Sequence, residues 1–148
     1  MRLQLALNVT DLAESIDFYE KMFATPVNKV KPGYANFPIE NPPLKLVLFE
    51  GAGDGGSINH LGVEVETAEE VTAAEARISE AGIDTTGIDD TLCCYASKTE
   101  TWVDAPDNRW EWYVKTGDSD EFDNIVVSGS GAGCCEPAET ARVDLAQP

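Results

Sequence analysis

Two adjacent cysteines, Cys93 and Cys94, stand in the stretch TLCCYA at residues 91–96. A second pair, Cys134 and Cys135, stands near the C-terminus in the stretch GCCEP, and these two pairs are all four cysteines of the chain. In a reducing compartment, cysteine pairs are more typical of metal binding or redox chemistry than of structural disulfides. The first pair is therefore a candidate for that chemistry.

Packing is the alternative explanation of this pair, because free cysteine is small, apolar and commonly buried. In a regular strand, alternation would place Cys93 and Cys94 on opposite faces of the sheet, which works against joint binding of one ligand. We therefore expect residues 91–95 to form a mobile loop near a site. A vicinal disulfide between the two cysteines would be strained.

A second candidate site consists of Gln4, His60 and Glu111. Each lies in a segment in which polar and apolar residues alternate. His60 is the only histidine of the chain, and it lies in INHLGVEV on the face opposite the apolar residues. Gln4 holds the matching place in LQLALNV, and Glu111 lies in RWEWYV. If the segments pair into one curved sheet, the three side chains converge on its concave face. An amide oxygen, an imidazole and a carboxylate could hold a divalent metal and leave positions open, as in facial-triad iron sites.

Each member of this set also has a simpler explanation when it is taken alone. A lone histidine is often structural, and Glu111 alone would be read as a solvated carboxylate on a strand. The matching positions of Gln4 and His60 in similar segments favour the metal site.

The elements that must position these residues repeat along the chain. Residues 3–9 alternate as a strand, and a helix follows with Asp11 as its N-cap and Glu14 three residues on. Strands then follow in YANFPI and LKLVLFE. The order restarts after the glycine-rich linker GAGDGGS at a period of roughly 56 residues.

The second repeat has a strand in INHLGVEV, a helix from Thr67 to Gly82, and strands at roughly 91–97, 100–104 and 110–115. The predicted fold class is α+β, with two tandem βαβββ modules, about 1–50 and 57–115, that form a curved mixed sheet. Residues 116–148 lack periodicity and are strongly acidic, so we expect a disordered tail, although the apolar stretch NIVV at 124–127 could dock on the domain.

Composition limits the partners of this protein. The chain has 148 residues, with 10 Lys and Arg against 27 Asp and Glu, for a formal net charge of −17. Phosphate backbones repel such a polyanion, so we expect no nucleic-acid partner. The sequence has no apolar run of membrane-spanning length and no signal-peptide pattern at its start, so we expect no membrane partner and a cytoplasmic location.

Several sequence blocks resemble a known superfamily. HLGVEV, DLAESIDFYEKMF and the tandem βαβββ order resemble the vicinal oxygen chelate superfamily, which includes glyoxalases, extradiol dioxygenases and fosfomycin-resistance proteins. Within it, KPGYANF, PPLKLVLFE, NHLGVEVE and CCYA look like the branch that contains organoarsenical carbon–arsenic lyases and the cadmium-induced proteins of actinobacteria. The resemblance covers residues 1 to about 115.

The resemblance implies a role for each candidate residue. Gln4, His60 and Glu111 match the metal positions, with Fe(II) as the expected ion and other divalent metals open. Cys93 and Cys94 match the arsenic-binding thiols, which would satisfy the two free valences of a trivalent organoarsenical and leave its carbon–arsenic bond exposed. The implied activity is Fe(II)-dependent cleavage of that bond with dioxygen, which releases arsenite and an oxidised organic fragment.

One position departs from the pattern of these relatives, which carry a lysine two residues before a tryptophan. Here Glu100 stands two residues before Trp102, and Lys98 lies further back. Either turnover is slower or Lys98 substitutes, and we count Lys98 and Tyr95 with the two cysteines as candidate catalytic residues. Three further residues are expected to line the cavity or pack in the core: Tyr34, Asn36 and Phe37.

Two other functions stay open. The protein could sequester cadmium or arsenite without turnover, which suits two vicinal cysteine pairs and an anionic surface. Another superfamily activity, such as thiol transfer or isomerisation, would leave the cysteine pairs unexplained. A homodimer is expected, because superfamily domains pair their modules within or between chains.

Overall fold

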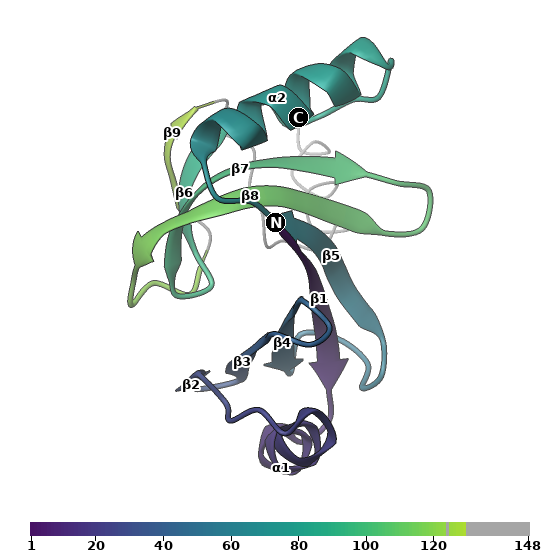
Figure 1. Ribbon diagram of the computed structural model, residues 1–148, viewed down its shortest axis with the longest axis vertical. Helices are drawn as coiled ribbons and strands as arrows, with labels where there is room; N and C mark the ends of the chain where they lie inside the picture. The colour runs from purple at the N-terminus through teal and green to yellow at the C-terminus, as the bar shows by residue number, and fades with distance from the viewer. Residues whose placement is uncertain (124, 130–148) are drawn as a thin grey trace, which may run out of the picture. The chain divides into compact units, whose positions relative to one another are not determined.

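The structure, a computed structural model, describes residues 1–123 and 125–129. Its backbone divides into two compact units (Figure 1). The first unit comprises Met1–Val65 and Asp104–Glu111, and the second comprises Glu66–Val103 and the chain from Trp112 onward. The strand β8 (Arg109–Asp118) contributes residues to both units. The second cysteine pair lies outside the described residues.

The first unit contains a mixed sheet. Its strands follow the order β2-β3-β4-β1-β5, and the first residues of β8 lie next to β5. β1 runs parallel to β4 and antiparallel to β5, so Gln4 pairs with Lys45 on one side and with Gly62 on the other. The strands are β1 (Arg2–Val9), β2 (Lys29–Lys31), β3 (Tyr34–Ile39), β4 (Leu44–Glu50) and β5 (Ile58–Glu64).

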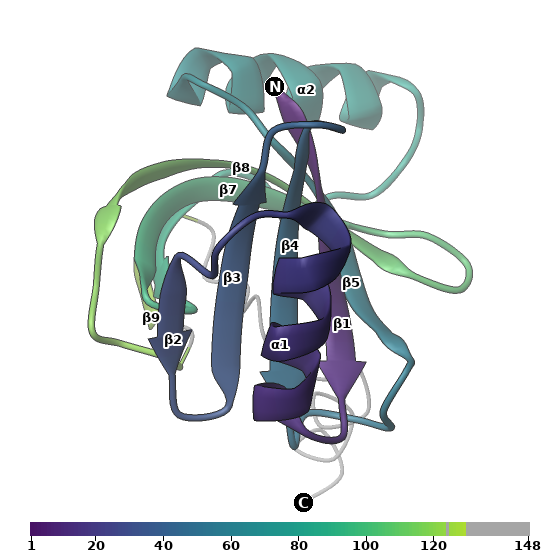
Figure 2. The ribbon, with the colours of Figure 1, turned by 60° about the horizontal axis from the view of Figure 1, so that its bottom comes forward.

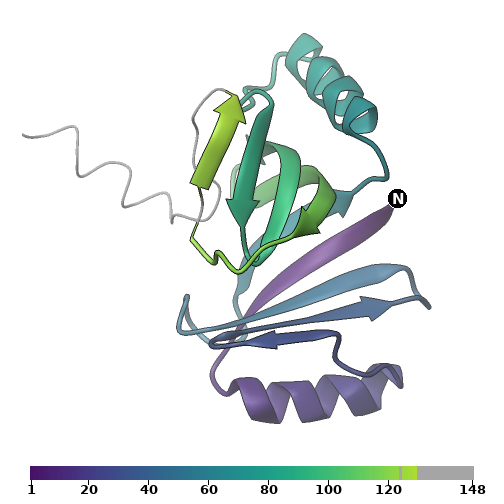
Figure 3. The same ribbon diagram turned by 90° about the vertical axis from the view of Figure 1, so that its left-hand side faces the viewer.

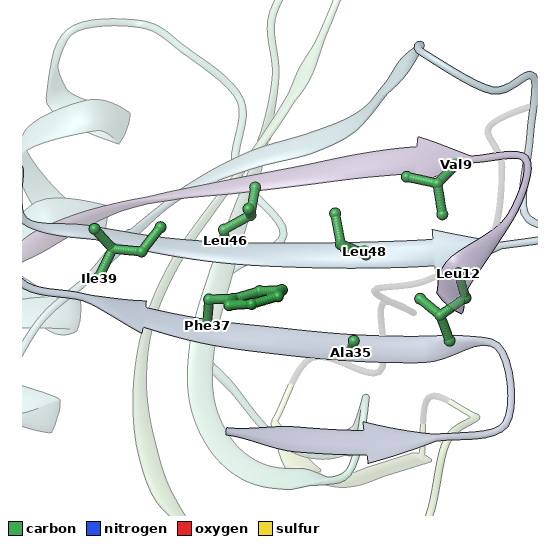
Figure 4. Close-up of a cluster of buried hydrophobic side chains, with 7 residues drawn as sticks. All are labelled: Val9, Leu12, Ala35, Phe37, Ile39, Leu46 and Leu48. Carbon is green, nitrogen blue, oxygen red and sulfur yellow. The ribbon is translucent and has the colours of Figure 1, made fainter. Parts of the chain in front are cut away.

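The helix α1 (Leu12–Phe23) lies against one face of this sheet (Figure 2). Asp11 caps it by accepting a hydrogen bond from the Glu14 backbone at 2.8 Å, as its sequence predicts. The Glu50 carboxylate accepts a second bond from the Leu12 backbone at 2.6 Å. Beneath the helix lies the apolar core of the unit (Figure 4), formed by Val9, Leu12, Ala35, Phe37, Ile39, Leu46 and Leu48.

The opposite face of β1 is more buried than its polar sequence indicates. Gln4, Ala6 and Asn8 are all buried, whereas Leu3 on the apolar face is 55% exposed. A strand with one apolar face was expected to bury only that face. On this face Gln4 hydrogen-bonds to His60 and Glu111, and Asn8 hydrogen-bonds to Ser57 and Asn59, so its buried polar side chains are paired.

The second unit contains the helix α2 (Ala68–Glu80) and the strands β6 (Asp89–Cys93), β7 (Ala96–Asp104), the later part of β8, and β9 (Ile125–Gly129). The strand order is β8-β7-β6-β9. Thr67 and Glu70 form the predicted capping box at the start of α2. The Arg77 guanidinium of α2 lies 5.7 Å from the centre of the Trp112 ring, which joins the helix to β8.

The first part of the expected tail is structured, which corrects the boundary at residue 115. β8 continues to Asp118, and β9 pairs antiparallel with the edge of β6 (Figure 3). Asp90 on β6 holds this pairing by accepting hydrogen bonds from Ser128 at 2.7 Å and from Thr99 at 2.6 Å. These two bonds, with the Thr99 bond the larger cause, lower the pKa of the Asp90 carboxyl. The apolar residues Ile125–Val127 thus dock as part of β9, the alternative that the sequence left open.

The order of elements confirms the predicted α+β class. β1, α1, β2, β3 and β4 form one βαβββ series, and β5, α2, β6, β7 and β8 form the next. β9 is an addition that the repeat does not predict. In the part of the chain that is described, no helix is both long enough and apolar enough to cross a membrane.

Candidate functional site

Gln4, His60 and Glu111 meet in the first unit, as their spacing predicts. The Gln4 Nε2 atom lies 2.9 Å from Glu111 Oε2 and 3.0 Å from His60 Nε2. His60 Nε2 and Glu111 Oε2 are 3.4 Å apart. The three residues are only 3%, 7% and 0% exposed in that order, so these contacts are shielded from water.

The Gln4 amide nitrogen lies within hydrogen-bond distance of both His60 Nε2 and Glu111 Oε2. A carboxylate has only acceptors, so the Gln4 atom that faces Glu111 is the NH₂ group, which only donates. The same NH₂ group faces His60 Nε2, which therefore presents its lone pair.

This donor set fits a divalent metal ion. Rotation of the Gln4 amide would exchange its NH₂ group for its oxygen, which gives one nitrogen and two oxygen donors. Such a set suits Fe(II) and related ions, and three protein ligands leave positions open for other molecules. Within residues 1–123 and 125–129, no group of three or more His, Cys, Asp or Glu is placed to hold a metal ion, so a three-ligand set here needs Gln4.

Gly62 gives the Gln4 side chain its room. A Cβ atom at Gly62 would lie 3.1 Å from the Glu111 backbone oxygen and 3.2 Å from Gln4 Nε2. These distances are shorter than ordinary van der Waals contact, so a side chain here would press on the Gln4 amide and the β8 backbone. The close approach of the Gln4 side chain and the Glu111 backbone thus explains the glycine in HLGVEV.

Aromatic rings extend the buried face next to His60. The Phe49 ring lies 6.2 Å from the His60 ring, and Tyr34 packs edge-on against Phe49 at 5.6 Å. Asn36 donates to the Tyr34 hydroxyl at 2.9 Å. Phe37, which we expected to line the cavity or pack in the core, is one of the core residues beneath α1. Phe49 was missed, because an aromatic residue in an apolar strand carries no functional signal.

Cys93 and Cys94 do not form the expected loop. Cys93 is the last residue of β6 and pairs with Ala96 of β7, so Cys94 and Tyr95 are the two central residues of a tight hairpin turn. Both have positive φ, 54° for Cys94 and 62° for Tyr95. This is the pattern of a type I′ turn, which usually uses Asn and Gly.

The turn brings the two sulfur atoms together. Because Cys94 leaves the strand conformation, the alternation that separates neighbouring side chains ends at Cys93. The two Sγ atoms are 3.1 Å apart, and both residues are buried. Cys94 is a free cysteine, and its Sγ atom faces that of Cys93.

Residues 119–122, which we term the strap, hold the turn in this conformation. The Cys94 backbone N–H donates to the Phe122 carbonyl at 3.0 Å, and the Tyr95 N–H donates to the Glu121 carbonyl at 2.9 Å. Ser119 donates back to the Tyr95 carbonyl at 3.1 Å. The Tyr95 ring packs on Phe122 at 5.5 Å, so Tyr95 has a structural role in the turn. The strap offsets the strain of two non-glycine residues with positive φ.

Lys98 is buried on β7, in the same unit as the turn. It is 5% exposed, and its Nζ atom lies 4.7 Å from the centre of the Tyr113 ring. Glu100, which takes the place of the lysine in the relatives, is 1% exposed and pairs with Asp89 of β6. The structure thus groups Gln4, His60 and Glu111 in one unit, and Cys93, Cys94, Tyr95 and Lys98 in the other.

Comparison with known proteins identifies relatives over nearly the whole chain. The family model of the Glyoxalase/Bleomycin resistance protein/Dioxygenase superfamily matches residues 3–96. A trivalent organoarsenical cleaving enzyme of Thermomonospora curvata is 47% identical over 147 residues, which is 98% of this chain and 95% of the relative. A cadmium-induced protein, CadI, of Mycobacterium bovis is 47% identical over 91% of this chain and 93% of its own length.

Solved structures show the same fold. An extradiol ring-cleaving dioxygenase from B. fuscum superposes with a TM-score of 0.58 over 81% of this chain. The sequence identity is 24%, and the match covers 34% of that larger chain. At this identity, the similarity concerns the fold alone.

We predict that Gly62→Ala weakens divalent-metal binding by about tenfold, because the added methyl group displaces Gln4 from the donor set. Metal competition titrations measure this affinity. Gly117→Ala on β8 is the matched control, since its Cβ would meet only the Ser97 hydroxyl. Equal affinities for both variants would show that Gln4 is not part of the metal site.

We predict that Phe122→Ala weakens binding of phenylarsine oxide to the reduced protein by about tenfold, which corresponds to about 1.4 kcal/mol. Loss of the ring contact with Tyr95 releases the turn that holds the two sulfurs together. Isothermal titration calorimetry measures the affinity. Phe18→Ala is the control, because Phe18 is an exposed ring on α1. An unchanged affinity would mean that the strap does not organise the thiols.

Proposed function

Since the chain belongs to the Glyoxalase/Bleomycin resistance protein/Dioxygenase superfamily, we propose that it cleaves the carbon–arsenic bond of trivalent organoarsenicals with Fe(II) and dioxygen. The observation that carries the proposal is the pair of converging sulfurs, 3.1 Å apart, in a chain that also buries Gln4, His60 and Glu111 together. Relatives of similar length named as organoarsenical cleaving enzymes support the substrate class.

The sulfurs of Cys93 and Cys94 would bind the arsenical. Trivalent arsenic with one organic group has two valences left for sulfur, and two thiolates held side by side satisfy both of them. The arsenical-binding form is therefore the one in which both cysteines are reduced. Burial of both residues excludes water from the bound arsenic.

Gln4, His60 and Glu111 would hold the ferrous ion. When bound, this ion would supply the electron-donating centre that activates dioxygen. The His60 imidazole and the Glu111 carboxylate provide the stronger donors, and Gly62 leaves the space in which the Gln4 amide turns. The neutral amide contributes least to affinity, so it is the ligand that this site uses to keep the ion reactive.

The overall reaction balances without another reductant. Methylarsenite, CH₃As(OH)₂, and one O₂ contain the same atoms as formaldehyde and arsenite, As(OH)₃. The carbon–arsenic bond breaks, one oxygen atom goes to carbon and one goes to arsenic. Carbon is oxidised and dioxygen is reduced, while arsenic stays trivalent.

Sequestration of cadmium or arsenite without turnover is the second candidate function. The thiol pair is compatible with it, and so is the similarity to a cadmium-induced protein. Sequestration by sulfur would not require the buried set of Gln4, His60 and Glu111 in the first unit. The two functions therefore differ in whether His60 is needed.

We predict that reduced protein loaded with Fe(II) releases about one equivalent of arsenite per methylarsenite in air, and that His60→Ala lowers the rate at least about 100-fold. The cause is loss of the only imidazole ligand. Arsenite is measured by chromatography coupled to mass spectrometry.

The matched variant for the second function is Cys93→Ser with Cys94→Ser. Turnover requires both His60 and the thiol pair, so each variant should lose arsenite release while His60→Ala still binds phenylarsine oxide. Arsenite release by His60→Ala at the wild-type rate would contradict the catalytic proposal. Protection from cadmium that survives in His60→Ala but is lost without the thiols would indicate sequestration.

A further inference from the structure

We propose that a chain of hydrogen bonds, which begins at the backbone carbonyl of Asp54, fixes His60 as the Nδ1–H tautomer and keeps Nε2 bare for a divalent metal. This inference rests on the metal site of the proposed function. It assigns Ser57, Asn8 and Asn59 as positioning residues, because they act through His60 and not on the substrate.

The chain of bonds is continuous. The Ser57 hydroxyl donates to the Asp54 carbonyl at 2.5 Å, and Asn8 Nδ2 donates to Ser57 Oγ at 3.0 Å. Asn59 Nδ2 then donates to Asn8 Oδ1 at 3.0 Å. Finally, Asn59 Oδ1 lies 2.8 Å from His60 Nδ1.

The first hydrogen bond, from Ser57 to Asp54, decides which group donates and which accepts in every later bond of the series. A backbone carbonyl only accepts, so the single hydrogen of the Ser57 hydroxyl is committed to Asp54. Ser57 Oγ must then accept, which turns the NH₂ group of Asn8 toward it and the oxygen of Asn8 toward Asn59. The same step repeats at Asn59, whose oxygen is left facing the imidazole. His60 Nδ1 must therefore be the donor.

The contact of the other ring nitrogen, Nε2, independently indicates the same tautomer. His60 Nε2 faces the Gln4 NH₂ group, which cannot accept a hydrogen bond. The Gln4 NH₂ group is itself oriented by the Glu111 carboxylate at 2.9 Å. Two separate networks, one at each ring nitrogen, thus place the proton on Nδ1 and the lone pair on Nε2.

An irregularity in β5 makes this contact available. Ala6 pairs with His60 and Leu7 pairs with Ile58, so Asn59 is the extra residue of a β-bulge. In a regular strand, Asn59 and His60 would point to opposite faces and their side chains would not meet. Bulges redirect side chains next to functional sites, and this one brings the Asn59 amide to the imidazole.

The glycine-rich segment at residues 51–57 contains Asp54 and Ser57, with which the series of hydrogen bonds begins. Its backbone pairs with β1, with Asn8 N–H donating to the Ser57 carbonyl at 2.9 Å and Gly56 N–H donating to the Asn8 carbonyl at 2.8 Å. A Cβ atom at Gly53 would lie 2.7 Å from Asn8 Nδ2. The segment is therefore more than a linker, because its lack of side chains lets it lie against the Asn8 amide.

The consequence concerns metal affinity. An imidazole that is free to exchange tautomers presents Nε2 as a bare donor for only part of the time, and a fixed tautomer removes this loss. A hydrogen bond from Nδ1 also raises the basicity of the metal-binding nitrogen. Asn59 is exposed, so we expect the contribution to lie near the lower end of the range for such partners, at about tenfold in metal affinity.

Nitrogen NMR of metal-free protein labelled with ¹⁵N-histidine tests the inference directly. His60 is the only histidine, so one pair of ring-nitrogen signals reports on it. At a pH where the imidazole is neutral, we expect a protonated Nδ1 and an unprotonated Nε2. A protonated Nε2 in the wild-type protein would overturn the inference, whatever the protein catalyses.

Substitutions of the residues in this series of hydrogen bonds test their positioning roles. Asn59→Leu removes the acceptor at similar size and should give a mixture of tautomers with about tenfold weaker Fe(II) or Mn(II) binding. Asn59→Asp keeps an acceptor and should restore the Nδ1–H signal. Ser57→Ala should shift the signals part of the way toward those of Asn59→Leu. Asn108→Leu, at an exposed turn of the first unit, is the matched control.

These measurements distinguish failure of the tautomer inference from failure of the proposed function. Wild-type signals in Asn59→Leu would overturn the positioning role of Asn59, and wild-type signals in Ser57→Ala would overturn the chain beyond it. Normal tautomer and metal affinities together with no arsenite release would leave this inference standing and contradict the proposed function.

Discussion

The first unit depends on one buried contact, in which the Gln4 amide stands between the His60 lone pair and the Glu111 carboxylate. Burial of a carboxylate is costly unless it is hydrogen-bonded, and the Gln4 amide donates to the Glu111 carboxylate at 2.9 Å. A divalent ion would neutralise the same two donors more fully, so metal binding and folding of this unit favour the same arrangement of strands.

The second unit depends on a different constraint, the conformation of the turn at Cys94 and Tyr95. A strand would separate neighbouring cysteine side chains, and a flexible loop would bring them together only part of the time. A two-residue turn with positive φ brings the sulfurs to 3.1 Å, and the strap at residues 119–122 holds it there. Both units thus use an irregular backbone to assemble donors, a bulge at Asn59 and a turn at Cys94.

The sequence predicted what depends on periodicity and failed where the backbone departs from it. Both βαβββ series, both helix caps and the meeting of Gln4, His60 and Glu111 follow from alternation and repeat spacing. The alternation of polar and apolar residues does not predict the turn at Cys94, the bulge at Asn59 or the strand β9 within an acidic tail. The Asn59 and Ser57 side chains were missed because polar residues next to a glycine-rich stretch look like linker. Only the structure shows that Asn59 contacts His60 and that Ser57 connects to Asn59 through Asn8.

In the proposed function, Gln4, His60 and Glu111, and not the cysteines, hold the metal of this protein. X-ray absorption spectroscopy of the reduced protein, loaded anaerobically with one equivalent of Fe(II), tests this most directly. We expect nitrogen and oxygen neighbours only, with the scattering pattern of a single imidazole that disappears in His60→Ala. Sulfur in the first coordination shell of the iron, or a spectrum that His60→Ala leaves unchanged, would contradict it.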